Sequence, residues 1–479
     1  MKKEELFETL SDIDEKKIKE AREYKKSGGA RIYRWITATV AVAAIAITAI
    51  FSPIFKSGDM TVPGYPKDVK TILASYPAPT AANLSAEEFV EGEAHWKWWD
   101  EFCAKADKTR DISGEMLDYY NNLSQQLLIN GDENTVISPL NTYIAFAMLA
   151  ETAEGNTRQQ ILDMLGASDI GSLRNNVKHL WESNYADTPT VKSLLANSLW
   201  LDSSRDFNEK TLKLLADNYY ASSFRGTPGS EAFSEALRKW TDDNTGNLLT
   251  DYTKDLKMNT NTVLAIMSTI YFKACWENKF YEEVNTSETF HGTKGDTTVE
   301  MMHQSDLTRY CITDKFTVVK LDLADSGYMF FYLPKEGVNV NELASDPEAL
   351  SLAQNPYDSR WDGIYVNMSI PKFKVTAQSD LIETLRALGV TDALDYAVAD
   401  FSPITEGKNE LFLSSAEHAA LVEIDEDGVT GAAYTALMIT EGAYLATQEL
   451  DFVLDEPFMF VVTGYDGSVL FDGLVKNIE

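Results

Sequence analysis

Apolar residues form one uninterrupted run near the N-terminus and mixed patterns elsewhere in the chain. Residues 35–55 (WITATVAVAAIAITAIFSPIF) contain no charged side chain. A helix of about 20 apolar residues spans the ~30 Å hydrocarbon core of a bilayer. The run therefore predicts a transmembrane signal-anchor helix at 35–55, preceded by a cytoplasmic N-terminal tail at 1–34.

The charges on the N-terminal side of this run predict its orientation. No acidic residue stands between Glu23 and the run, whereas four basic residues do: Lys25, Lys26, Arg31 and Arg34. Basic flanks stay in the cytoplasm, so we expect a single-pass protein of the cell membrane with everything after Phe55 outside. The alternative is a cleaved signal peptide and a secreted protein, which the many small residues of the run favour. The long leading segment and the lack of an Ala-x-Ala site argue against cleavage.

The segment 56–112 changes in character along its length. Its first part is rich in proline, which is typical of a stalk: Pro63, Pro66, Pro77 and Pro79. Its second part contains Trp96, Trp98 and Trp99. Because tryptophan side chains are seldom left in water, we expect this second part to pack against the folded domain.

From residue 113 onward, helical and strand-like patterns follow one another. Apolar residues recur at helical spacing in 116–128 and 141–153. Later segments are rich in β-branched and aromatic residues, as buried strands are: 263–272, 316–321, 328–333 and 458–463. Helices early and strands late predict an α+β domain at 113–479 with a large antiparallel or mixed sheet.

Charge and cysteine content narrow the possible partners. The net charge of −32, which also favours solubility, argues against nucleic acid, heparin-like polyanions and anionic membrane faces as partners of the folded domain. Cys103, Cys275 and Cys311 are too few and too scattered for a disulfide framework or a metal cluster, although one pair is possible. We therefore expect neither a metal nor a cofactor.

Several segments carry more information than periodicity does. Those in the first part of the domain are 134–141 (NTVISPLN), an alanine-rich helix followed by 155–157 (GNT), 196–200 (ANSLW), Trp240, 245–247 (TGN) and 270–277 (IYFKACWE). Those in the second part are 371–374 (PKFK), 400–402 (DFS), 420–428 (ALVEIDEDG), 457–460 (PFMF) and 470–475 (LFDGLV). In this order they resemble the landmarks of the serpin family of serine protease inhibitors, over about 113–479. The N-terminal run adds a resemblance to membrane-anchored members of prokaryotic type.

The resemblance implies a serpin fold, with three β-sheets, eight to nine helices and an exposed reactive loop held under strain. It also implies a suicide-type inhibitor, which forms a covalent complex with its target serine protease. The cleaved loop inserts into the central sheet and traps the acyl-enzyme, a loop-insertion transition that is established for this family. Within this resemblance, the hinge and insertion positions are Glu426, Gly428, Val429, Gly431, Ala433 and Thr435.

The residues of this loop support the same interpretation. Starting at Val429, every second residue is small or apolar: Val429, Gly431, Ala433, Thr435, Leu437 and Ile439. Alternate residues of a strand face the same side, so this face can enter a packed core without meeting a charge or a large side chain. A flexible surface loop is the simpler explanation of the segment, but it does not need such a face.

Two further groups of residues follow from the resemblance. The family's gate beneath the sheet matches Ser138, Asn141, Ser268 and His418, with Asn141 at a serine position and Ser268 at an asparagine position. This exchange keeps the same donors and acceptors. At the upper end of the sheet, Trp276 matches the family's tryptophan, and Lys372 matches the lysine that pairs with the acid at Glu426. Val429 departs from the usual Thr or Ser, but nothing in its side chain blocks insertion.

The scissile bond is placed by counting along the loop. Counting forward from Glu426 gives Gly442, and counting back from Pro457 gives Ala446, so the loop is about four residues longer than usual. The candidate positions are Gly442, Ala443, Tyr444 and Leu445. No Lys or Arg occurs between Lys408 and Lys476. We therefore expect extracellular elastase-like or chymotrypsin/subtilisin-like targets and no trypsin-like ones.

Three alternatives remain at this point. A hydrolase would need a motif such as His-Glu-x-x-His, Gly-x-Ser-x-Gly or a phosphate-binding loop, and the sequence has none. The other histidines (His95, His179, His291 and His303) lie in unrelated contexts, so we do not expect an enzyme. The remaining alternatives are a non-inhibitory serpin that acts as a binding module and an inhibitor of cysteine proteases.

Overall fold

The computed structural model describes residues 66, 69–72, 74, 76–129, 131–405, 411–429 and 449–479. All of them belong to one compact unit, Phe55–Glu479. The predicted cytoplasmic tail and the predicted transmembrane helix lie outside the described residues. Within the described part of the chain, no helix has both the length and the hydrophobicity needed to cross a membrane.

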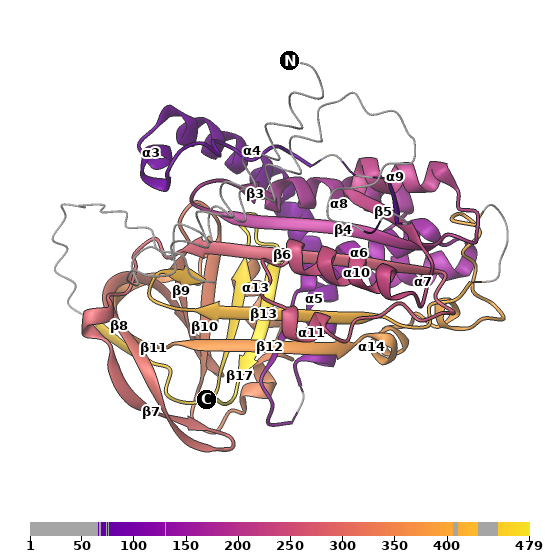
Figure 1. Ribbon diagram of the computed structural model, residues 1–479. Helices are drawn as coiled ribbons and strands as arrows, with labels where there is room; N and C mark the ends of the chain where they lie inside the picture. Colours follow the sequence, from indigo (N-terminus) through magenta and orange to yellow (C-terminus); the bar gives the residue numbers. More distant parts are fainter. Residues whose placement is uncertain are drawn as a thin grey trace, which may run out of the picture. The chain divides into compact units, whose positions relative to one another are not determined.

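Eight strands form the first sheet, whose long strands lie across the middle of Figure 1. Their order is β1 (Lys70–Ile72), β5 (Ala221–Gly226), β4 (Lys192–Asp202), β6 (Leu264–Cys275), β14 (Gly428–Val429), β13 (Glu417–Ile424) and β12 (Phe373–Asp380), with β3 (Ala186–Asp187) on β4. Every ladder is antiparallel except β4–β5. The predicted strand 263–272 is confirmed as β6.

Nine strands form the second sheet. Their order is β15 (Glu449–Val453), β11 (Asp362–Pro371), β8 (Gly295–Ile312), β9 (Phe316–Asp322), β10 (Tyr328–Pro334), β16 (Phe458–Thr463), β17 (Val469–Val475) and β2 (Thr135–Ile137), with β7 (Thr286–Gly292) on β8. The three remaining predicted strands are confirmed as β9, β10 and β16. Strand β8 pairs in turn with β7, β11 and β9, so the described strands form two continuous sheets where three were expected.

The described residues contain twelve α-helices, more than the eight or nine expected. They are α3 (Ala86–Val90), α4 (Glu93–Glu115), α5 (Leu117–Leu127), α6 (Pro139–Thr152), α7 (Gly155–Met164), α8 (Ile170–Asn184), α9 (Glu209–Tyr219), α10 (Glu231–Asn244), α11 (Thr250–Thr253), α12 (Val340–Leu343), α13 (Pro347–Gln354) and α14 (Ile382–Ala387). Two 3-10 turns, η2 (Glu282–Val284) and η3 (Asp392–Leu394), complete the set. The surplus arises from α3 and α4, which begin before the predicted domain, and from the one-turn helices α11 and α12.

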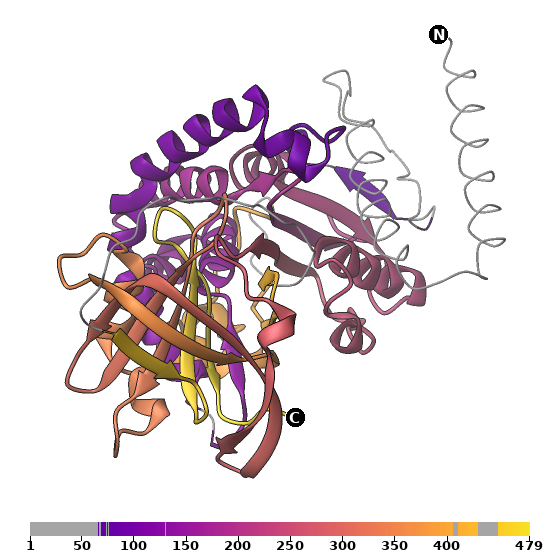
Figure 2. The same ribbon diagram turned by 90° about the vertical axis from the view of Figure 1, so that its left-hand side faces the viewer.

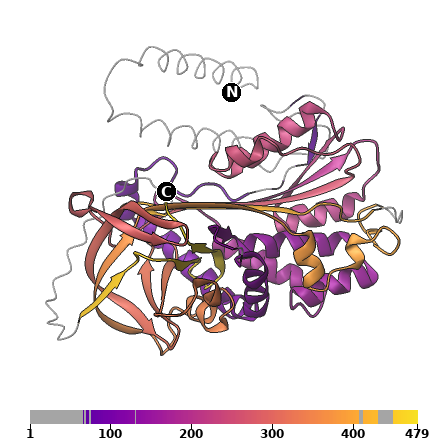
Figure 3. The ribbon, with the colours of Figure 1, turned by 90° about the horizontal axis from the view of Figure 1, so that it is seen from below.

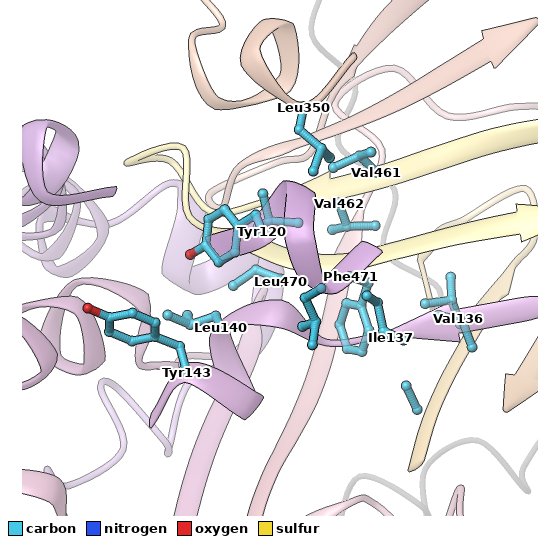
Figure 4. Packing of buried hydrophobic residues seen from close by; sticks show 14 of the residues in the cluster. Tyr120, Val136, Ile137, Leu140, Tyr143, Leu350, Val461, Val462, Leu470 and Phe471 are labelled. Atoms are coloured by element: carbon cyan, nitrogen blue, oxygen red, sulfur yellow. The ribbon is translucent and has the colours of Figure 1, made fainter. Parts of the chain in front are cut away.

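Both faces of the first sheet are covered, as Figure 3 shows with α10 on one side and most other helices on the other. The alternation of side chains along β4 accounts for this arrangement. Leu199 and Leu201 belong to the main core, whereas Ala196 and Trp200 pack with Phe233 of α10 in a second cluster. Helix α6, which includes most of the apolar segment 141–153, is buried almost all round. Figure 4 shows its Leu140 near Leu470 of β17 in the main core, with Phe471 of β17 beside Ile137.

The segment before the predicted domain packs against it, as expected for its second part. The ring of Trp99 meets Tyr465 of the domain edge to face at a centroid distance of 5.3 Å, and Trp98 and Trp99 stack on Phe102 at 5.1 and 5.5 Å. Trp96, in contrast, is 63% exposed, so its burial was predicted wrongly. Strand β1, from the part read as a stalk, adds a strand to the edge of the first sheet at β5. Figure 2 shows α4 and β1 as separate indigo segments on the outside of the body.

A carboxyl group is completely buried in β17. The Asp472 side chain accepts a hydrogen bond from Ser124 Oγ at 2.5 Å, whereas no described group bonds to its Oδ1 atom. Burial raises the pKa of Asp472 to about 7, because the hydrogen bonds from Ser124 and the Gly473 backbone offset only part of the cost of removing the charged form from water. The folded protein therefore favours the neutral acid.

This burial predicts a pH-dependent stability. In the unfolded chain the Asp472 carboxyl ionises near pH 4, so its contribution to the free energy of unfolding is largest below pH 4. That contribution falls as the pH rises from 4 to about 7. We expect Asp472→Asn to gain stability over the wild type between pH 5 and pH 8, by up to about 4 kcal/mol. Urea unfolding measures the difference, and exposed Asp132→Asn is the control. Parallel pH profiles for wild type and Asp472→Asn would contradict the assignment.

Candidate functional site

The first sheet has an unusual centre, where β6 and β13 flank the two-residue strand β14. Gly428 and Val429 of β14 pair with Cys275 and Ala274 of β6, and Val429 also pairs with Ile424 of β13. Both ladders are antiparallel, so β6 and β13 run in the same direction. Among the residues that the structure describes, no ladder joins β6 to β13 directly. The two strands therefore flank a position for one more strand, which β14 begins (Figure 1).

The orientation of β14 is fixed by Val429. Its side chain is 2% exposed and belongs to the main core, as do Ala274 and Ile424 on either side. A strand that continued from Val429 would direct every second residue to the same buried face. The predicted insertion residues Gly431, Ala433 and Thr435 lie outside the described residues, as do the scissile-bond candidates Gly442, Ala443, Tyr444 and Leu445.

Gly428 is required at the start of β14. A Cβ atom at this position would lie 2.2 Å from the carbonyl oxygen of Ala274 and 2.7 Å from Cα of Cys275. The turn before it is closed by Asp425, whose Oδ1 accepts from the backbone N–H groups of Asp427 and Gly428 at 3.0 and 3.1 Å. Any residue larger than glycine would push the chain away from β6.

Trp276 holds this turn from the side of β6. Its indole Nε1 donates to the carbonyl oxygen of Asp425 at 2.9 Å, and its backbone N–H donates to that of Asp427 at 3.0 Å. The side chain is buried and meets the ring of Phe280 edge to face. The tryptophan identified at the upper end of the sheet thus contacts the turn that leads into the loop.

The structure brings Lys372 and Glu426 together, and two further residues join them. Lys372 Nζ lies 2.5 Å from Glu426 Oε1 and 2.9 Å from Glu300 Oε1. Asn285 Nδ2 donates to the same two carboxylates, at 2.5 Å to Glu426 and 3.0 Å to Glu300. We call these four residues the Lys372 cluster. Sequence analysis missed Asn285, which directly precedes β7, and Glu300 of β8, because no motif marks them.

The Lys372 cluster keeps its central pair charged. Partial burial opposes ionisation of Glu426, but the hydrogen bonds from Lys372 and Asn285 outweigh it and lower the pKa of Glu426. Partial burial likewise opposes the charge of Lys372, but its hydrogen bonds to Glu426 and Glu300 raise the pKa of Lys372. The turn before β14 is therefore held by an ion pair at neutral pH.

The four gate residues form two pairs rather than one cluster. The Ser138 backbone N–H donates to His418 Nε2 at 2.9 Å, while Ser138 Oγ donates to the Leu470 carbonyl oxygen at 2.6 Å. Burial lowers the pKa of His418 to about 4, so the imidazole is neutral and Nε2 is free to accept this bond. This pair ties the start of α6 to β13.

The second pair ties the start of α6 to β6. Asn141 Nδ2 donates to the Ser268 carbonyl oxygen at 3.0 Å, and the Ser268 hydroxyl donates back to Asn141 Oδ1. Ser138 and Asn141 are one helical turn apart, so the first turn of α6 reaches both strands that flank β14. The gate hydrogen bonds form two separate pairs because Ser138 lies on the side of β13 and Asn141 lies on the side of β6.

The cysteines and the possible metal ligands are the remaining candidate groups. Among the described residues, Cys103, Cys275 and Cys311 form no disulfide with one another. The described part of the chain contains no group of three or more histidine, cysteine or acidic residues placed to hold a metal ion.

Comparison with known proteins identifies this fold. The family model described as "Serpin (serine protease inhibitor)" matches residues 116–478. The chain therefore belongs to the serpin family. It is 28% identical to Serpin-Z2A of Oryza sativa subsp. japonica over 73% of this chain and 92% of that protein. It is 27% identical to human neuroserpin, over 75% of this chain and 90% of the relative.

Solved structures agree with this assignment of the fold. The native state of the thermophilic serpin Tengpin superposes with a TM-score of 0.68 at 24% identity, covering 77% of this chain and 94% of that one. The complex of thyroxine-binding globulin with thyroxine gives a TM-score of 0.66 at 25% identity, over 78% and 99% of the two chains.

The exchanged gate residues generate a prediction. Asn141→Ser should shorten the side chain and leave the Ser268 carbonyl without its donor, while Ser268→Asn should crowd the same site. Each change alone should lower the free energy of unfolding by about 1–3 kcal/mol. The double exchange Asn141→Ser/Ser268→Asn should recover most of this loss, because it restores one long and one short partner. Urea midpoints of the four proteins measure the coupling. Simple addition of the two losses would refute the pairing.

Proposed function

We propose that this serpin is a suicide-type inhibitor of extracellular serine proteases and not an enzyme. The observation that carries the proposal is the position of β14 between β6 and β13. A chain that continues β14 would gain antiparallel partners on both sides, and antiparallel ladders are somewhat more stable than parallel ones. These new hydrogen bonds and buried side chains would drive insertion of the loop.

The reaction begins as ordinary proteolysis. The protease serine attacks the scissile carbonyl, the peptide bond breaks, and the C-terminal fragment leaves with a new amino group. The N-terminal side of the loop is then held as an ester on the protease. If the cleaved strand inserts before water hydrolyses this ester, the protease is carried along and distorted. The 15 residues from Gly428 to Gly442 would reach about 50 Å when extended, comparable to the diameter of a domain of this size.

The register of β14 supports insertion at this place. Val429 lies opposite Ala274 of β6 and Ile424 of β13. If an inserted strand continued in this register, Thr435 would lie opposite both Ser268 and His418. These are the strand residues of the two gate pairs. The inserted strand would therefore place a small polar side chain between the two polar residues that face each other across the site. A charged or bulky residue there would have no such partners.

A non-inhibitory binding module is the second candidate. The fold is similar to that of thyroxine-binding globulin, which was solved in complex with thyroxine. The inward-facing loop residues favour inhibition, because neither a charge nor a proline interrupts Val429, Gly431, Ala433 and Thr435. Formation of a covalent complex distinguishes the two.

Incubation with a panel of proteases tests the function. We expect SDS-stable complexes with elastase, chymotrypsin or subtilisin and none with trypsin, because the loop offers no basic residue to a trypsin-like pocket. Mass spectrometry of the released peptide should place the cut between residues 440 and 446. A stable complex with trypsin, or a cut elsewhere, would overturn the proposed target class.

A matched pair of loop variants tests the insertion mechanism. In an extended strand, Ala433 would face the same side as buried Val429, whereas Ala432 would face the other side. Ala433→Arg would bury an unpaired charge in the sheet, which is prohibitively costly, so we expect cleavage of the loop without a stable complex. Ala432→Arg carries the same charge on the opposite face, where the register would place it level with the half-exposed Tyr271 of β6, and should still form the complex. Equal inhibition by both variants would exclude insertion in this register.

We also propose that the chain is a membrane-anchored serpin of prokaryotic type, with the domain outside the cell. The support is the uncharged run 35–55 and its basic flank. In intact cells, an external protease should release the domain and leave residues 1–55 behind, with a tag at the N-terminus protected. A mature N-terminus near residue 56 would instead establish cleavage and secretion.

A further inference from the structure

Lys372 is shared between two carboxylates that belong to different parts of the fold. Glu426 lies in the turn that precedes β14, so its ion pair holds the start of the loop. Glu300 lies on β8 and reaches Lys372 Nζ at 2.9 Å. Asn285 Nδ2 donates to both, so the two acids bind the same two donors.

Two carboxylates that share donors in this way also repel each other. Glu426 is the more buried of the two, with 16% of its side chain exposed against 50% for Glu300. With one ammonium group for two carboxylates, the group carries one excess negative charge. Like charges only a few ångströms apart are unfavourable, although water screens the interaction near the surface. Glu300 therefore weakens the hold of Lys372 on Glu426.

Glu300 also changes what happens when Glu426 moves. If the turn shifts while the loop inserts, an isolated Lys372 would lose its only partner and remain as a half-buried, unpaired charge. Here Glu300 already lies in contact with Lys372, and it can take over the freed ammonium group. The released state is therefore stabilised at the same time as the held state is weakened.

We propose that Glu300 is a positioning residue that eases release of the loop's hinge, by competing with Glu426 for Lys372 and Asn285. The inference deepens the proposed function and rests on it. A purely structural ion pair between Glu300 and Lys372 would have the opposite consequence, because its loss would loosen this end of the sheet. The sign of the effect separates the two roles.

The experiment measures how fast intact protein converts, on mild heating, to a form that resists unfolding in urea. Glu300→Gln should slow the conversion about fivefold, which corresponds to ~1 kcal/mol for an interaction near the surface. Glu426→Gln should speed it. Glu288→Gln is the matched control and should convert at the wild-type rate, because this carboxylate on the neighbouring strand β7 contacts Thr286 and His303 and not Lys372.

The double variant Glu300→Gln/Glu426→Gln supplies the decisive comparison. Without Glu426 there is nothing to compete for, so the double variant should convert at the same rate as Glu426→Gln alone. The effect of Glu300→Gln should also shrink in 1 M NaCl. Faster or unchanged conversion of Glu300→Gln, or an equal effect in both backgrounds, would overturn the proposal.

Failure of the proposed function gives a different result. Wild-type protein cut in the loop should gain resistance to urea as the strand inserts. If the cut protein gains no resistance to urea, both the insertion mechanism and the role of Glu300 are wrong. If the cut protein gains resistance while Glu300→Gln converts at the wild-type rate, only the proposed role of Glu300 is wrong.

Discussion

The direction of two strands is the constraint on which the rest of this structure depends. Strands β6 and β13 run the same way and are joined, among the described residues, only through β14. A strand placed between them gains two antiparallel ladders, whereas the two could otherwise pair only in parallel. The described arrangement thus leaves unused hydrogen-bonding capacity at the centre of the sheet. Under the proposed mechanism the native state persists because of a kinetic barrier and not because it is the most stable form.

The contacts at the two ends of this site are weak enough to be broken in turn. At the upper end the Lys372 cluster is half-exposed and holds the turn with an energy on the order of 1 kcal/mol. Further down, the Asn141–Ser268 and Ser138–His418 pairs are buried, and each hydrogen bond there stabilises by about 1 kcal/mol but costs more when one partner is left alone. A barrier assembled from several such contacts can be tuned by single residues. Under the proposed mechanism it would be crossed stepwise from Gly428 toward the gate pairs, because each pair would be released as the next residue of the loop arrived.

Features that depend on neighbouring residues in the sequence could be predicted, whereas features that depend on contacts between distant segments could not. Strands β9, β10 and β16 were predictable because they are rich in β-branched and aromatic residues, and α6 because its apolar residues recur at helical spacing. The contact between Glu426 and Lys372 followed from the family resemblance. Asn285 and Glu300 could not be found, because their position beside Lys372 depends on the β7–β8 hairpin. The two sheets, in place of the three expected, arise from the length of β8. The exposure of Trp96 arises from the orientation of α4 against the domain. No local sequence pattern encodes either feature.

The length of β6 bears on where the proposed cut must fall. Strand β6 has 12 residues, and Gly428 lies opposite the last of them, Cys275. Continued in the same register, the inserted strand would reach the first residue, Leu264, at Ile439. Glu441, with its charge, would thus lie beyond the end of β6 and would not have to be buried. A bond cut before Ile439 would leave part of β6 without a partner and weaken the driving force. A cut at 442–445 fills the whole strand and leaves a short tether at its lower end, to which the trapped protease would be attached.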